Sequence, residues 1–190
     1  FNEIFARLFG VKQNIESSVI TGLILAAIIG PISLSTEWQW LLVASGAAMA
    51  SKYIFAIRKS HIFNPAAFGV VVAGLLGYSA SWWIGSPVTL PIVLVGGVLI
   101  LYKIHRLHLV VSFVATYIAL LLADVFLMRG GNMHDVSTLF NTIFVYSPIL
   151  FFSFIMLVEP LTSPQTRNGR IYFGAVLGAL LFVPEWLGGE

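Results

Sequence analysis

Seven long apolar stretches constrain the fold of this chain more than any other feature. They lie near residues 18–35, 38–57, 64–84, 88–103, 108–127, 138–158 and 170–187. A helix of about 20 mostly apolar residues spans the hydrocarbon of a bilayer. Only 9% of the residues are charged, against roughly 25% in soluble domains. The sequence therefore predicts an all-α polytopic membrane protein with six to seven transmembrane helices, the last of them short.

The N-terminal residues 1–17 differ from the rest of the chain. Apolar residues from Ile4 to Val11 fall roughly on one helical face, with Arg7 and Lys12 elsewhere. This pattern predicts a short amphipathic helix at the membrane interface, with a frayed terminus as the alternative. We expect residues 18–190 to form the transmembrane domain. This domain is either trimmed from a fusion with a cytoplasmic reductase domain or associated with such a domain as a separate chain.

The distribution of basic residues predicts the orientation in the membrane. If the N-terminus is cytoplasmic, nine of the ten Lys and Arg residues fall on the inside, and Arg129 alone falls outside. Cytoplasmic loops of membrane proteins carry this excess of cations. The inside cations are Arg7, Lys12, Lys52, Arg58, Lys59, Lys103, Arg106, Arg167 and Arg170.

Several function classes are excluded or disfavoured by residue types. The chain has no cysteine, which excludes thiolate metal sites, iron–sulfur ligation and cysteine nucleophiles. A net charge of +2 is too small to indicate nucleic acid as a partner. The four histidines fall near predicted helix ends, which argues against haem. His105 and His108 are three residues apart, but without a nearby carboxylate they indicate an interfacial belt rather than a metal site.

Proline interrupts most of the apolar stretches, so some of the helices must be broken or re-entrant. Ser147 and Pro148 lie in the middle of one stretch, where proline removes a backbone hydrogen bond and kinks or breaks the helix. A broken helix at membrane depth frees backbone groups that protein or a lined cavity must satisfy. Such breaks often mark a ligand site; an ordinary proline kink is the alternative.

Asn64 and Pro65 predict the start of a helix at the cytoplasmic edge. Asn is a favoured N-cap residue and Pro suits the first helical position. Lys52, Arg58, Lys59 and His61 precede this start. Unpaired amides and cations together favour a phosphate or another anion. In the alternative reading these cations only anchor a loop at lipid headgroups.

A second polar cluster covers residues 159–170. Ser163 and Pro164 repeat the pattern of a cap followed by proline, which predicts a second helix start on the same side. Glu159 ends an apolar stretch and needs a partner, such as Arg167, Arg170 or Lys52; an interfacial carboxylate is the alternative. Two helix starts facing one region would form a polar cradle.

Three stretches resemble one known family. Residues 61–69 (HIFNPAAFG), 101–122 (LYKIHRLHLVVSFVATYIALLL) and 159–181 (EPLTSPQTRNGRIYFGAVLGALL) are similar, in this order, to the membrane subunits NqrB and RnfD. These belong to the sodium-pumping NADH:quinone reductase and the Rnf complex. The last stretch resembles the family signature DP(V/L)TSPTTxxGRxxFGxxxG. The resemblance implies an NqrB/RnfD-like fold in the bacterial inner membrane.

The resemblance also implies a flavoprotein that carries electrons. Members of this family attach FMN through a threonine in an SGAT loop, which lies between the motifs that resemble residues 61–69 and 159–181. In this chain the corresponding residues 77–89 contain no SGAT sequence. We therefore expect noncovalent FMN, with riboflavin or a second flavin as a further option. The implied donor is a cytoplasmic NAD(P)H-oxidising flavin domain, and a homodimer would place flavins in series. The predicted cofactor-binding residues are Lys52, Arg58, His61, Asn64, Glu159, Thr162, Ser163, Thr166, Arg167 and Arg170.

Two other function classes fit the same sequence. One is a small-solute channel or transporter, because the family fold resembles that of urea transporters and broken helices suit a substrate path. The other is an assembly subunit without a cofactor.

Overall fold

The computed structural model describes the chain except at residues 13, 31–35, 58–59, 129 and 188–190. The chain divides into two compact units, Phe1–Ile84 and Gly85–Glu190. Each unit has its own apolar core. Apart from one short hairpin, the described residues form helices and irregular connections, as the sequence predicts.

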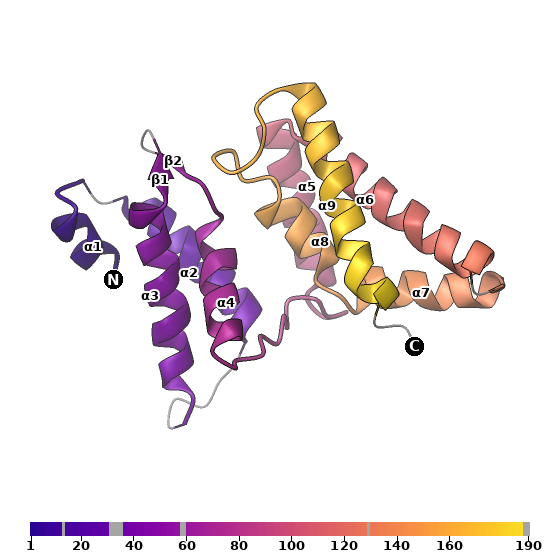
Figure 1. Ribbon diagram of the computed structural model, residues 1–190, viewed down its shortest axis with the longest axis horizontal. Coiled ribbons are helices and arrows are strands. Elements are labelled where there is room, and N and C mark those ends of the chain that lie inside the picture. Colours follow the sequence, from indigo (N-terminus) through magenta and orange to yellow (C-terminus); the bar gives the residue numbers. More distant parts are fainter. Residues whose placement is uncertain (13, 31–35, 58–59, 129, 188–190) are drawn as a thin grey trace. The chain divides into compact units, whose positions relative to one another are not determined.

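The first unit is built on the close packing of two helices. Its elements are α1 (Asn2–Leu8), α2 (Ile15–Ile29), α3 (Trp38–Ile54), the antiparallel strands β1 (Ala56–Ile57) and β2 (Ser60–His61), and α4 (Pro65–Leu75) (Figure 1). Gly69 of α4 lies against the backbone of Ala44 and the side chain of Ala48 in α3, where a Cβ would clash. Small residues at this crossing therefore let the two backbones approach closely.

The predicted N-terminal helix is confirmed, but only over Asn2–Leu8. It packs on α3 through Tyr53, whose hydroxyl lies 2.7 Å from Asn2 Oδ1. The Tyr53 ring stacks on Phe5 and Phe9 at centroid distances of 6.0 and 5.8 Å. This terminus is thus a docked helix, and its position at a membrane interface stays a prediction.

The apolar stretch 64–84 is helical only in its first half. Helix α4 begins at Pro65 as predicted, but it ends at Leu75, three residues before the predicted end at Tyr78. Gly77 has a φ of 102°, and the following segment turns to cover the C-terminal carbonyl groups of α2. Tertiary donors satisfy carbonyl groups that the end of a helix leaves without partners, and Ala26 O also accepts the Gly30 amide at 3.3 Å. The donors are Tyr78 Oη to Ile29 O (3.0 Å), Ser81 Oγ to Ile29 O (3.1 Å), Trp82 N to Ile28 O (2.8 Å) and Trp83 Nε1 to Ala26 O (2.7 Å).

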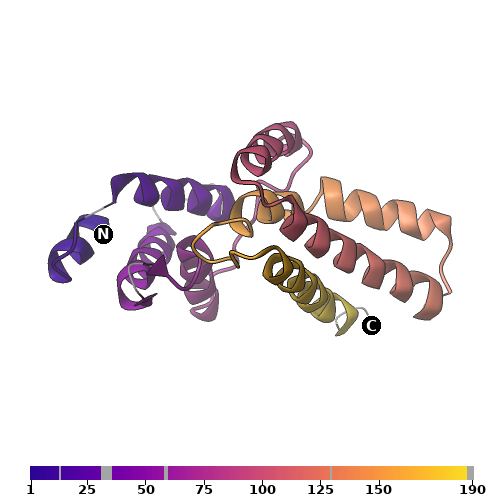
Figure 2. The same cartoon turned by 90° about the horizontal axis from the view of Figure 1, so that it is seen from above.

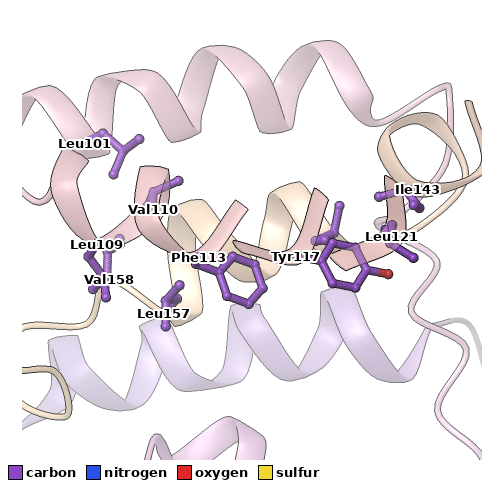
Figure 3. Packing of buried hydrophobic residues seen from close by; sticks show 10 residues of the cluster. Leu101, Leu109, Val110, Phe113, Tyr117, Leu121, Ile143, Leu157 and Val158 are labelled. Atoms are coloured by element: carbon purple, nitrogen blue, oxygen red, sulfur yellow. The ribbon is translucent and has the colours of Figure 1, made fainter. Parts of the chain in front are cut away.

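The second unit is dominated by the pair α6 and α9. Its elements are α5 (Leu90–Ile104), α6 (Leu107–Ala123), the π-helix η1 (Asp124–Met128), α7 (Met133–Val145), α8 (Ile149–Phe151), the π-helix η2 (Phe152–Met156) and α9 (Arg167–Leu187). Figures 1 and 2 show α9 running beside α6. Phe113 and Tyr117 of α6 are almost fully buried in the core of this unit (Figure 3).

The predicted break at Pro148 is confirmed. Helix α7 ends at Val145, and the next helical segment, Ile149–Met156, is bent from it by 57°. The Ser147 hydroxyl donates to Ile143 O and so satisfies one freed carbonyl group. Gly85 lies against the Pro148 backbone with no space for a Cβ, so this break also packs against another part of the same unit.

Membrane-length helices are fewer than the apolar stretches suggest. Among the described residues one helix, Leu107–Leu127, has the length and hydropathy of a span; Met133–Val145 and Ile149–Met156 give a second if counted together. Ile15–Ile29, Pro65–Leu75 and Leu90–Ile104 are apolar but shorter. Within its described residues the structure therefore shows one or two helices that are long and apolar enough to span a membrane. The remaining transmembrane helices of the predicted six to seven stay a prediction.

Candidate functional site

The connection between η2 and α9, which we call the 159–166 loop, is folded tightly on itself. The Ser163 hydroxyl donates to Glu159 O at 2.6 Å, and the Ser163 amide donates to the same oxygen at 3.2 Å. Gln165 Nε2 donates to Pro160 O at 2.6 Å. These bonds close a compact turn and present the polar residues of the loop at the start of α9.

The N-cap of α9 is Thr166, and the predicted helix start at Ser163 and Pro164 is wrong. Thr166 Oγ1 accepts from the Gly169 amide at 3.1 Å, and Thr166 O accepts from the Arg170 amide at 3.0 Å. Both bonds are those of an N-cap residue. Ser163 cannot take this role, because its hydroxyl is already bonded within the loop and to Arg106.

Arg106 holds the 159–166 loop from the junction of α5 and α6. This residue is only 3% exposed and immediately precedes α6. One terminal nitrogen donates to Ser163 Oγ and, at 3.1 Å, to Pro164 O; the other donates to Gln165 Oε1 at 3.0 Å. The sequence indicated only an interfacial cation here, and no local pattern identifies a contact 57 residues away.

Arg170 holds the same loop from α9. Its Nε donates to Pro164 O at 3.1 Å, and its terminal nitrogens donate to His105 O at 3.1 Å and Gln165 O at 2.9 Å. His105 ends α5 in the left-handed conformation, with a φ of 53°. Pro164 O therefore accepts from two guanidinium groups, and Arg170 joins α9 to the end of α5.

Among the described residues, the two guanidinium groups at this loop donate only to neutral oxygens. In the part of the chain that the structure describes, neither Arg106 nor Arg170 lies within ion-pair distance of a carboxylate. Burial, followed by repulsion from Arg170, lowers the pKa of Arg106. Arg nevertheless stays protonated in proteins, so two cations share one small loop.

The other predicted residues of this cluster are more exposed. Arg167 is exposed, and its side chain forms no hydrogen bond or ion pair with the described residues. Glu159 is half-buried and accepts from Thr162 Oγ1 at 3.3 Å. Among the described residues no ion pair joins Glu159 to Arg167 or Arg170, because Arg170 donates to backbone carbonyl groups. The third predicted partner of Glu159, Lys52, stays a prediction.

The first unit holds the other predicted cluster. Asn64 caps α4 as predicted: its Oδ1 accepts from the Ala67 amide at 3.0 Å, and Pro65 is the first helical residue. His61 lies in β2. Lys52 Nζ donates to Ser17 O at 2.9 Å and Ser17 Oγ at 3.0 Å, which ties α3 to the first turn of α2. Arg58 lies outside the described residues.

The two clusters that were predicted to form one polar cradle thus belong to different units. Asn64 belongs to Phe1–Ile84 and the 159–166 loop belongs to Gly85–Glu190. The pairing of the two helix starts around one ligand remains a prediction.

A cavity of about 650 Å³ lies between η1, α7 and α9, and no sequence motif indicated it. Asp124, His134, Asp135 and Thr138 are among its polar lining residues. Asp135 Oδ2 accepts from the Asn132 amide at 2.8 Å as part of a capping box. Across the described residues, no three His, Asp or Glu side chains gather in a way that could hold a metal ion.

The fold and the loop together define a class of protein. Apolar helices, a helix broken at proline and a loop held by two guanidinium groups describe an all-helical protein with a candidate anion site. The sequence model of the NQR2, RnfD, RnfE family matches residues 72–189. Since this is well over half of the chain, the chain belongs to the NQR2, RnfD, RnfE family, as the sequence motifs predicted.

The family gives the chain its general setting. Its members are membrane subunits of NADH:quinone and Rnf redox complexes, and the family is known for flavin-bearing subunits. This chain is therefore a membrane protein of that family. The matched residues include α5 to α9 and the 159–166 loop, but not Asn64. No curated protein and no solved structure matches the chain.

Proposed function

We propose that this protein is a membrane-embedded electron carrier that binds FMN noncovalently. Electrons would come from a cytoplasmic NAD(P)H-linked reductase, fused or separate, and pass to an acceptor in or across the membrane. The observation that carries the proposal is the 159–166 loop, which two guanidinium groups hold inside the residues matched to a flavin-bearing family, with neither group in an ion pair among the described residues.

The donors around this loop fit the phosphate of FMN. Thr166 Oγ1 accepts a hydrogen bond from the Gly169 amide. Among the described residues, the amides of Arg167 and Asn168 donate to no protein acceptor. Free amides and the helix dipole favour an anion at this end of the 21-residue α9. We propose that these amides and the exposed Arg167 side chain hold the phosphate, while Arg170 adds charge.

The remaining proposed contacts concern the flavin ring. When bound, FMN supplies electron transfer that protein side chains cannot perform. Glu159 and Thr162 would meet its polar edge from the 159–166 loop, with Lys52, Arg58, His61 and Asn64 contributing from the other cluster. Ser163 instead shapes the loop, because its hydroxyl donates to Glu159 O and accepts from Arg106.

Noncovalent binding is supported by three hydroxyl groups in residues 77–89, those of Ser81, Ser86 and Thr89. This segment has no SGAT sequence. Ser81 Oγ donates to Ile29 O, and Ser86 Oγ lies 3.0 Å from Thr89 Oγ1. Hydroxyl groups engaged in capping a helix or closing a turn are poor candidates for a phosphodiester bond.

The test is the absorbance spectrum of the purified full chain in detergent after incubation with FMN. We expect flavin bands that persist through gel filtration, with at least about one flavin per chain, and release of intact FMN on denaturation, identified by mass spectrometry. A preparation that stays colourless after FMN addition refutes the proposal. Flavin that remains attached after denaturation refutes its noncovalent part.

Transfer across the membrane needs more than one flavin. A single flavin covers only part of about 30 Å of hydrocarbon. We propose either a second flavin, FMN or riboflavin, or a homodimer within a multi-subunit complex of the kind its family forms. The N-terminus would be cytoplasmic. Native mass spectrometry of the flavin-loaded protein should give a dimer or two flavins per chain; a monomer with one flavin contradicts this step.

A solute channel is the second candidate, favoured by the 57° break at Pro148 and by the cavity near η1. Proteoliposomes separate the two functions. An electron carrier loaded with FMN should reduce an enclosed acceptor without moving solute, whereas a channel should give passive urea flux without flavin.

A further inference from the structure

The single buried guanidinium of Arg106 is bonded to three successive residues of the 159–166 loop. Its acceptors are Ser163 Oγ, Pro164 O and Gln165 Oε1, all neutral oxygens. We infer that Arg106 is a positioning residue: it fixes the loop in its binding shape before a ligand arrives and lends its positive charge to the bound anion. This inference rests on the proposed flavin site.

The place of Arg106 in the chain makes it a rigid anchor. It lies between His105, which ends α5, and Leu107, which begins α6. Its carbonyl oxygen accepts from the Leu109 amide at 3.0 Å, within the first turn of α6. A side chain that starts between two helix ends has little freedom, and its planar fork presents several donors in fixed directions.

The geometry connects three elements through one carbonyl group. Pro164 O accepts from Arg106 on the α5 and α6 side and from Arg170 on the α9 side, each at 3.1 Å. A shift of Arg106 would therefore move Pro164 and, through Arg170, change the position of the first turn of α9, which begins at Arg167. Site residues held by such supporting contacts lose precision when the support is removed.

A purely structural role does not account for the charge. A neutral side-chain amide at position 106 could donate to some of the same oxygens. Burying a cation without a carboxylate, in contrast, costs free energy. The repulsion from Arg170 adds to that cost. An anion bound at the start of α9 would offset both costs, and this is the role that we assign to the charge.

The experiment compares Arg106→Lys, Arg106→Gln and the control Lys103→Gln in the full chain in nanodiscs. Lys103 is exposed, lies in the last turn of α5 and forms no hydrogen bond or ion pair with the described residues. Amide hydrogen exchange without ligand reports on residues 161–166, and fluorescence titration with FMN and with inorganic phosphate reports on binding. Removing hydrogen bonds from a charged group should weaken FMN binding about tenfold or more.

We expect faster exchange at residues 161–166 in both Arg106 variants, with α6 and the rest of α9 unchanged, and wild-type behaviour in Lys103→Gln. Lysine keeps the charge, so Arg106→Lys should recover part of the affinity that Arg106→Gln loses. Unchanged exchange in the loop overturns the inference, and so does equal affinity of the Lys and Gln variants. If Arg106→Gln does not fold, Ser163→Ala provides the second variant for the exchange test.

Failure of the flavin proposal is distinguishable from failure of this inference. A wild-type protein that binds neither FMN nor phosphate refutes the flavin site, and with it the part assigned to the charge. Amide hydrogen exchange at residues 161–166, measured without ligand, tests the positioning role of Arg106 independently of flavin binding.

Discussion

The packing of α9 on α6 allows a quantitative test at Gly174. A Cβ on this residue would lie 2.5 Å from Leu109 O and 3.0 Å from the Phe113 amide nitrogen. Carbon and carbonyl oxygen normally approach to about 3.3 Å, so the two helices would have to separate by about 0.8 Å. Backbone atoms of a helix cannot move aside locally, and overpacking of this kind costs about 1 to 3 kcal/mol.

Gly96→Ala is the matched control for Gly174→Ala. Gly96 lies inside α5, and a Cβ there meets nothing within 4 Å. Because Ala is better than Gly in a helix by about 0.5 to 1 kcal/mol, the control should be neutral or more stable. Thermal unfolding in one detergent, followed by circular dichroism and gel filtration, compares the two variants.

We expect a lower unfolding temperature for Gly174→Ala and an unchanged or higher one for Gly96→Ala. Gly178, one helical turn away, is placed in the same way against Phe113 O at 2.5 Å, so Gly178→Ala should behave like Gly174→Ala. If Gly174→Ala is as stable as the control, the close contact between α6 and α9 is wrong.

Three further predictions concern local contacts. Thr166→Ala removes the N-cap of α9 and should cost about 0.5 to 2 kcal/mol in thermal unfolding, whereas the exposed Ser79→Ala should cost nothing; equal effects would contradict the cap. Tyr53→Phe removes the hydroxyl bond to Asn2 and should speed hydrogen exchange of α1, with unchanged exchange as the refuting result. Gly85→Ala should lower the unfolding temperature, since its Cβ would clash with the Pro148 backbone; wild-type stability would contradict this contact.

Local features of the fold could be predicted because their causes are local. Asn64 and Pro65 start α4 as expected, since an amide side chain and a fixed φ act on the next few residues alone. The same holds for the break at Pro148, where proline removes a hydrogen bond within its own helix. These predictions needed no knowledge of neighbouring helices.

Features that depend on distant contacts could not be predicted in this way. Ser163 and Thr166 both suit an N-cap, and the choice between them follows from Arg106, 57 residues away, which bonds the Ser163 hydroxyl. Helix α4 ends early because residues beyond Gly77 satisfy carbonyl groups of α2, about 50 residues earlier in the chain. The role of Arg106 itself arises entirely from such long-range contacts.

The central claim is that the 159–166 loop and the start of α9 bind the phosphate of a noncovalent flavin. The most direct measurement is a titration of the purified full chain with FMN and, separately, with riboflavin, which lacks the phosphate. Charge-assisted hydrogen bonds to the phosphate should make FMN bind about tenfold to a hundredfold more tightly than riboflavin. Equal affinities, or no binding of either flavin, would contradict the claim.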